Sequence, residues 1–171
     1  DTEEYHLDWT ANGHSVMVSY WIHINDLEKL SNWLAQVQPL KQNYNHFSQC
    51  HSRNVARAMI ATQSYQAAQT LLTELQADAE HCGLMVELNR THILLAQLFW
   101  CQSTPAETPT EPVALAAQDH MRAQALKHFA TAIEMATSTG AITSFLKLGS
   151  SLIAMVELLQ AEGTLSELAA Q

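Results

Sequence analysis

The sequence is poor in basic residues. Only eight Lys and Arg stand against seventeen Asp and Glu, which gives a formal net charge of −9 at pH 7 with the histidines neutral. The basic residues are also scattered, whereas a nucleic-acid-binding surface needs them clustered on one face. We therefore expect no direct contact with DNA or RNA by this stretch of chain.

Long apolar runs and secretion signals are lacking as well. No stretch of eighteen apolar residues occurs, so the sequence predicts no transmembrane helix and no membrane partner. The first residues, DTEEYHLDW, have neither the basic nor the apolar region of a signal peptide and no initiator Met, so we expect a piece of a longer chain. Three cysteines without paired spacing (Cys50, Cys82, Cys101) favour a reduced, cytoplasmic setting.

Motifs for catalysis and for cofactors are also missing. The sequence has no Gly-rich phosphate loop, no nucleophile elbow and no pair of carboxylates in a plausible cleft, so we expect neither an enzyme nor a bound cofactor. His46 and Cys50 lie four residues apart, which is compatible with a metal site. Arg53 and Arg57 continue the same helical stripe and would repel a cation, so we set the metal interpretation aside.

Helix breakers are few, with five Gly and four Pro in 171 residues. Between His46 and Trp100 the chain reads as three helices separated only at 63–64 and 81–83. Breaks this short join antiparallel helices that touch each other. The pattern therefore predicts helical hairpins.

A repeated register supports this interpretation. Small and large apolar residues recur at helical spacing and close on a glycine, once as Ala68, Leu72, Leu75, Ala79 and Gly83, and again as Ala125, Phe129, Ala132, Ala136 and Gly140. Such units are typical of tetratricopeptide-like arrays. We predict an all-α fold, a right-handed superhelix of antiparallel helical hairpins forming one domain over 1–171, with a Pro-rich loop at 103–112 inserted between paired helices. An ordinary antiparallel helix bundle is the alternative.

The expected elements follow from caps and breakers. Residues 1–13, with a turn signal at Asn12-Gly13, should lead in loosely, and Asp26 and Ser64 should cap the helices that follow them. Gly83 should end a helix in the left-handed conformation. The predicted helices cover 14–24 (short and buried), 27–37, 46–62, 65–81, 84–101, 113–139 (with a possible break near Asp119), 141–160, and a final short piece from Thr164.

One polar stripe is the candidate binding surface. A helical wheel places His46, Cys50, Arg53 and Arg57 on one side of their helix, and Arg90 shares a stripe with Gln97 on the next first helix of a pair. In a solenoid these stripes should face the groove, where guanidinium groups beside an aromatic ring suit a polyhydroxylated ligand. The alternative is that the arginines form ion pairs between stacked helices, such as Glu87 with Arg90. His92 and His128 lie among apolar residues and should be hydrogen-bonded core histidines.

Several segments carry a family resemblance: SYW (19–21), NHF (45–47), RNVARAMI (53–60), LMVELNR (84–90), LLAQLFW (94–100) and the TG-I--F pattern at 139–145. They resemble the tetratricopeptide-like sensor domain of the MalT family, the maltotriose-responsive, ATP-dependent transcription activators of the LuxR type. The match covers most of 14–148 and is interrupted by the Pro-rich loop. The motif positions carried over are Tyr20, Trp21, Arg53, Asn54, Arg57, Glu87, Asn89, Arg90 and Trp100, and all of these except Trp21 are our candidate ligand-binding residues.

The resemblance implies a role in regulation. In the family, the helical domain senses an oligosaccharide inducer, and inducer with ATP drives self-association and promoter binding. ATP and DNA would bind to other segments, since this sequence has neither a P-loop nor a helix-turn-helix. The resemblance therefore implies the sensor region of an activator of a maltose regulon, and the alternative is a tetratricopeptide-like scaffold for a peptide or partner protein.

Overall fold

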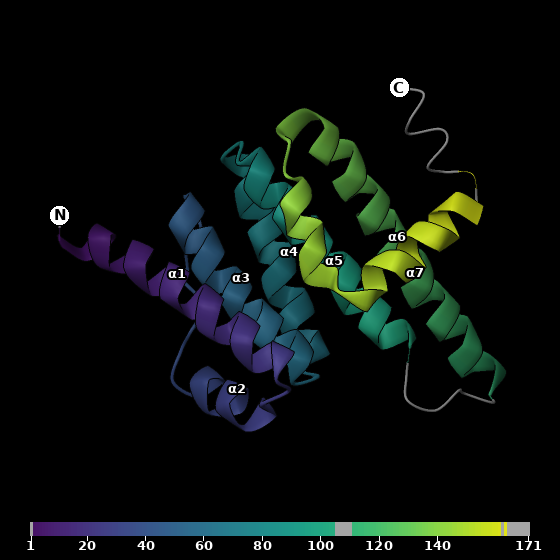
Figure 1. Ribbon diagram of the computed structural model, residues 1–171, viewed down its shortest axis with the longest axis horizontal. Coiled ribbons are helices and arrows are strands. Elements are labelled where there is room, and N and C mark those ends of the chain that lie inside the picture. The colour runs from purple at the N-terminus through teal and green to yellow at the C-terminus, as the bar shows by residue number, and fades with distance from the viewer. Residues whose placement is uncertain (1, 105–110, 162, 164–171) are drawn as a thin grey trace. The chain divides into compact units, whose positions relative to one another are not determined.

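The computed structural model describes residues 2–104, 111–161 and 163, and these are all-α, as predicted. They form α1 (Thr2–His23), α2 (Leu27–Leu34), α3 (His46–Ala61), α4 (Tyr65–His81), α5 (Met85–Ser103), α6 (Pro112–Thr139), the 3₁₀ helix η1 (Ile142–Leu148) and α7 (Ser150–Ala161) (Figure 1). The chain divides into two compact units, residues 1–91 and 92–171, and the boundary falls inside α5. The expectation of one domain over 1–171 stays a prediction.

The first unit is built around α3. This helix packs against α1 on one side and α4 on the other, while α2 contacts both α1 and α3. The core contains Ala11 and Val18 of α1, Val55 of α3, and Leu72 and Leu75 of α4, each at most 1 % exposed. The three-residue connection from α3 to α4 makes these two helices an antiparallel hairpin, as the sequence predicts.

Local signals place most of the helix ends correctly. Asp26 caps α2 by accepting a hydrogen bond from the Lys29 amide, and Gly83 adopts φ 67° after α4. Asn45, for which no cap was predicted, caps α3 in a reciprocal box with Ser48. Ser64 occupies the cap position of α4, but its side chain makes no capping hydrogen bond.

The expectation of a loose lead-in over residues 1–13 is wrong. α1 begins at Thr2 and passes through Asn12-Gly13 without a break. Packing overrides the turn signal here, because Ala11 is fully buried and its carbonyl accepts a hydrogen bond from Asn54 Nδ2 at 3.0 Å. The helix over 14–24 is confirmed, but it is not buried all round, since Val16 and Tyr20 are 71 % and 58 % exposed.

The second unit comprises the end of α5 with α6, η1 and α7. One apolar cluster joins these elements, with Ile93 of α5, Phe129 and Ala132 of α6, Phe145 of η1 and Met155 of α7 among its members. His92 and His128 approach each other through their Nδ1 atoms at 2.9 Å, and His128 stacks on Phe99. The prediction that both are hydrogen-bonded histidines of the interior is confirmed for His92, while His128 is only partly buried.

Two predicted helices of this unit differ from expectation. α6 runs from Pro112 to Thr139 without the possible break near Asp119. Asp119 lies on the exposed face of the helix, where its charge is solvated without an interruption of the helix. Gly140 ends the helix at φ 69°, as predicted. The single helix predicted over 141–160 is wrong. It is divided into η1 and α7 at Gly149, whose φ of 58° and ψ of −134° lie outside any helical region.

The structure describes only the ends of the predicted Pro-rich loop and none of the helical piece predicted from Thr164. α5 ends at Ser103 and α6 begins at Pro112, so both end residues of the loop predicted over 103–112 belong to helices, and the loop itself stays a prediction. Residues 105–110, and the piece predicted from Thr164, lie outside the described residues.

Candidate functional site

A buried carboxylate forms the centre of the predicted site. Glu87, in the first turn of α5, is 4 % exposed. It forms an ion pair with Arg53 of α3, accepts a hydrogen bond from Arg90 Nη1 at 2.9 Å, and lies 2.6 Å from Nδ1 of His46. Three basic side chains from two helices therefore converge on one acidic group.

The electrostatics of this cluster favour the ionised carboxylate. Burial by itself raises the pKa of Glu87, but the charges of Arg53 and Arg90 and the hydrogen bond from His46 outweigh it, so the pKa lies below its usual value. Burial in turn lowers the pKa of Arg53, and Glu87 opposes that effect. The cluster thus links α3 to α5 through one buried carboxylate that is paired with two guanidinium groups.

Arg53 also forms a hydrogen bond within its own helix, α3. Its Nη1 donates to Gln49 Oε1 at 3.4 Å, and Gln49 Nε2 donates to the carbonyl oxygens of Asn43 at 2.9 Å and Leu75 at 3.1 Å. The expectation that the stripe of His46, Cys50, Arg53 and Arg57 faces an open groove does not describe Arg53, which is 6 % exposed. Arg53 instead forms the kind of ion pair weighed as the alternative, between α3 and α5, whereas Arg90 pairs with Glu87 within α5.

Arg57 differs from these two arginines. Its Nη2 donates to Ser19 Oγ of α1 at 3.1 Å, while its Nη1 is shielded from solvent and has no hydrogen-bond partner among the described residues. It forms no ion pair with an acidic residue in the described part of the chain. Burial lowers the pKa of this guanidinium. Arg57 therefore keeps a buried donor without a described partner, whereas Arg53 and Arg90 both donate to Glu87.

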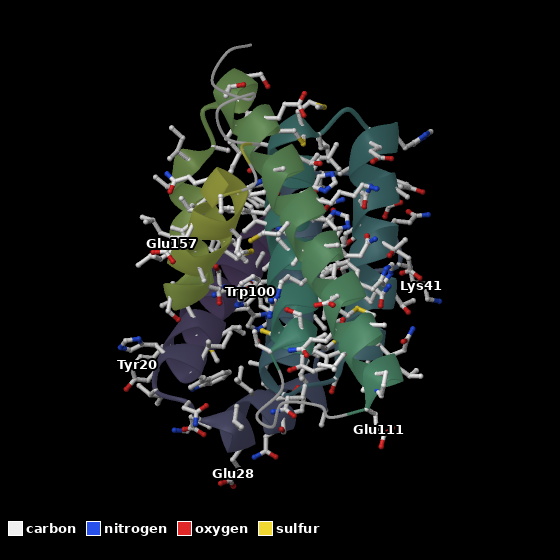
Figure 2. All side chains as sticks on the ribbon, turned by 90° about the vertical axis from the view of Figure 1, so that its right-hand side faces the viewer. Tyr20, Glu28, Lys41, Trp100, Glu111 and Glu157 are labelled. Atoms are coloured by element: carbon white, nitrogen blue, oxygen red, sulfur yellow. The ribbon has the colours of Figure 1, made fainter. Side chains whose placement is uncertain are left out.

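The remaining candidates have separate roles in the first unit. Asn54 is 2 % exposed and ties α3 to α1 through the Ala11 carbonyl, with Cys50 Sγ 3.9 Å from its amide nitrogen. Asn89 is fully buried on α5. Tyr20 projects from the outer side of α1 and is 58 % exposed (Figure 2). Of these three side chains, only that of Tyr20 is exposed to solvent.

Trp100 belongs to the second unit, where it packs against the apolar cluster. The structure therefore brings together Arg53, Glu87 and Arg90, places Arg57 nearby on the same helix as Arg53, and gives Trp100 a separate packing role.

Sequence reasoning missed two polar partners. Gln49 precedes Arg53 by four residues, which is the spacing at which helical side chains meet, so this pair was detectable. Ser19 is a different case, because it meets Arg57 only through the packing of α1 on α3, and no local pattern signals that contact.

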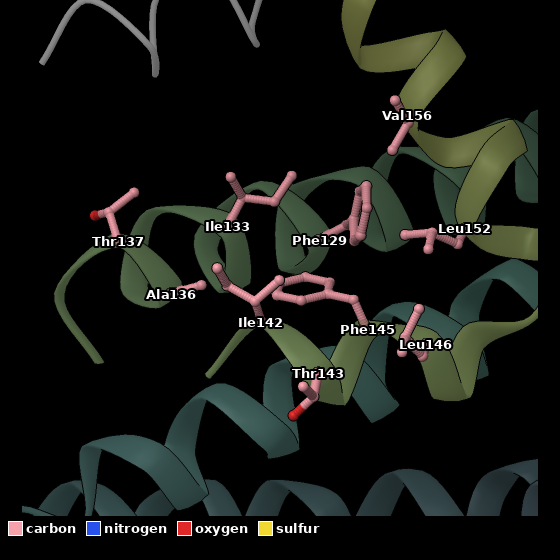
Figure 3. A pocket seen from close by; sticks show the side chains of 10 residues that line it. All are labelled: Phe129, Ile133, Ala136, Thr137, Ile142, Thr143, Phe145, Leu146, Leu152 and Val156. Atoms are coloured by element: carbon pink, nitrogen blue, oxygen red, sulfur yellow. The ribbon is translucent and has the colours of Figure 1, made fainter. Parts of the chain in front are cut away.

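A pocket of about 480 Å³ lies in the second unit between α6, η1 and α7 (Figure 3). Its walls are almost wholly apolar, with Phe129 and Ile133 on α6, Phe145 on η1 and Leu152 on α7. No sequence pattern predicted it.

Within the described ranges, no group of three or more His, Cys, Asp or Glu side chains is placed to hold a metal ion. No described helix combines the length and the apolar character needed to cross a membrane.

Comparison with known proteins agrees with the helical architecture. The family model of the MalT-like TPR region matches residues 1–162. Two curated relatives, the HTH-type transcriptional regulators MalT of Klebsiella pneumoniae subsp. pneumoniae and of Klebsiella pneumoniae strain 342, are each 33 % identical over 164 residues. The match covers 96 % of this chain but 16 % of each relative, so the chain spans about a sixth of their length. With its repeated hairpins and this match over nearly all of its residues, the chain belongs to the family of MalT-like TPR regions.

Proposed function

We propose that this chain is a non-enzymatic, inducer-sensing domain of a transcription activator, and that its ligand is an oligosaccharide of the maltotriose type. Family membership and the relatives, which are transcriptional regulators, support the regulatory part of this proposal. By the same likeness the full-length protein works in the cytoplasm, activates a maltose regulon, uses ATP and DNA-binding segments other than this one, and self-associates with inducer and ATP.

The observation that carries the sugar hypothesis is the state of Arg57. A guanidinium that is largely withdrawn from water, has a shielded and unpartnered Nη1 and lacks a described carboxylate partner is costly to maintain for stability alone. Hydroxyl oxygens of a sugar can accept from such a group. Ser19 of α1, which accepts a hydrogen bond from Arg57 Nη2, adds a hydroxyl group beside this guanidinium.

Calorimetric titration of maltotriose tests this directly. Arg57→Met keeps the apolar stem but removes the donors, and we expect it to weaken binding about tenfold or more. Arg122→Met, which alters an arginine of the second unit, is the matched control and should leave the affinity unchanged. A full-length protein that binds no maltotriose would rule out the sugar, and equal affinity in both variants would rule out Arg57 as its contact.

A second function is favoured by a different observation. The outer face of α1 carries three exposed apolar side chains at helical spacing, Trp9 (79 %), Val16 (71 %) and Tyr20 (58 %). Such a row suits an apolar helix or peptide, as expected of a tetratricopeptide-like scaffold. Val16→Asp should abolish partner binding but leave maltotriose affinity intact if the chain is a scaffold.

A further inference from the structure

Two equivalent segments of the repeat fold differently. Aligning Gly140 with Gly83 places Phe145 on Leu88 and Met155 on Leu98, and all four of these side chains are at most 8 % exposed. The earlier segment forms α5 as one continuous helix from Met85 to Ser103. The later segment is interrupted at Gly149, and its first part is a 3₁₀ helix.

The broken segment retains the pattern of a single helix. Ile142, Phe145, Leu152, Val156 and Leu159 follow spacings of three, seven, four and three residues, which is one apolar stripe of a continuous α-helix. Gly149 falls within this stripe. In the present conformation Ile142, at its beginning, is 68 % exposed.

The break itself has a local cause. Gly149 has φ 58° and ψ −134°, a conformation that glycine adopts far more readily than other residues. Apart from Gly149 itself and its two chain neighbours, no atom lies within 4 Å of the position that a Cβ would occupy, so a side chain there would meet no steric obstacle from the surrounding structure. The seven-residue length of η1 is also unusual, because 3₁₀ helices rarely exceed three or four residues and long ones often mark hinges.

The bend and the apolar pocket are parts of one arrangement. Four residues of the stripe, Ile142, Phe145, Leu152 and Val156, line the pocket from the two sides of the bend, while Phe129, Ile133 and Ala136 of α6 form its floor (Figure 3). A continuous helix would place these four side chains in one row facing α6.

We propose that residues 142–161 exchange between the bent form seen here and a straight helix lying along α6, with Gly149 as the hinge and the apolar pocket closed in the straight form. The pocket exists only in the bent form, so any apolar group that enters it stabilises that form over the other. This two-state element is independent of the proposed sugar site and lies wholly within the second unit.

Replacing the hinge residue provides the first test. Gly149→Ala penalises the positive φ and raises helix propensity at the same position, so it should shift the ratio of straight to bent forms about thirtyfold toward the straight helix. In the isotope-labelled 171-residue chain, NMR contacts between residues four apart should then run without interruption across position 149, and the Cα shifts of 142–148 should become α-helical.

Gly83→Ala is the matched control. Gly83 also has a positive φ, 67°, and open space at its Cβ position, but it ends α4 in the first unit. This variant should lose stability without changing the shifts of residues 142–161. If Gly149→Ala behaves in the same way, the hinge proposal is wrong.

The unaltered chain provides a second test, which does not depend on whether Gly149→Ala folds. Relaxation dispersion at the Ile142 and Leu152 methyl groups should reveal a minor state, and its shifts should match those of the variant where that variant folds. Flat dispersion profiles at both methyl groups would overturn the exchange.

Discussion

Arg53 of α3 and Glu87 of α5 form an ion pair in which the two side chains are only 7 % and 5 % exposed. Neither residue has water to replace its partner, so each depends on the other for the solvation of its charge. The pair also connects two helices through residues that are 34 positions apart in sequence.

Glu87→Gln should therefore be strongly destabilising. The substitution keeps the shape of the side chain but leaves the Arg53 charge buried without its counter-charge, and we expect a loss of about 3–5 kcal/mol in the free energy of unfolding. Arg90→Gln removes the more exposed partner, which is 36 % accessible, and should cost about 1 kcal/mol or less. Urea denaturation of both variants measures these two losses in the free energy of unfolding. Equal losses would contradict the assignment of Arg53 as the dominant partner of Glu87.

Asn54→Ala should loosen α1. Its amide donates to the Ala11 carbonyl in the interior, and removing it leaves that carbonyl without this hydrogen bond, at a cost of about 1–3 kcal/mol. Hydrogen exchange should accelerate along α1 more than along α4. Asn32→Ala, at an exposed position of α2, is the control and should change neither quantity.

The sequence was sufficient for elements whose signals are local. Gly83 and Gly140 end their helices as predicted, and the small-large register around Leu72 and Phe129 correctly indicated buried hairpin faces. It was insufficient where distant packing decides. Asn12-Gly13 reads as a turn, but α3 holds that part of α1 in a helix, and the contact of Arg57 with Ser19 depends on how the two helices cross.

The arginines of the candidate site show the same limit of prediction from the sequence. Their clustering on neighbouring helices was readable, and Arg53 and Arg90 do converge on Glu87. Periodicity could not distinguish Arg53, which is neutralised by an ion pair, from Arg57, which is not. That distinction comes from the exposure and partners of each group.

Stability should fall in acid because of His128. Burial, His92 and Lys127 lower the pKa of His128 to about 4, whereas the unfolded chain takes up a proton near pH 6.5. Between these values the unfolded state binds more protons, so the free energy of unfolding decreases as the pH falls, by about 1–2 kcal/mol after allowance for screening at a partly exposed ring.

His128→Gln removes this titration while retaining a hydrogen-bonding group beside His92. The difference in unfolding free energy between pH 7 and pH 4.5 should therefore shrink in this variant. His81→Gln, at an exposed position at the end of α4, should leave that difference unchanged. An unaltered pH dependence in His128→Gln would show that another group is responsible.

Phe129 of α6 has the largest fully buried side chain among the described residues. It is 1 % exposed, meets Phe145 edge-to-face with ring centroids 5.7 Å apart, and also forms part of the pocket floor. Phe129→Ala deletes a buried ring next to existing free volume, and we expect a loss of about 3–5 kcal/mol. Leu146→Ala trims a pocket residue that is 73 % exposed and should change stability by no more than about 0.5 kcal/mol. If denaturation finds the two losses similar, then either Phe129 is not packed as described or Leu146 is buried in solution. Hydrogen-exchange rates of the α6 amides would distinguish these two cases. Only a loosely packed Phe129 predicts rapid exchange in the helical turns from Leu126 to Ala132.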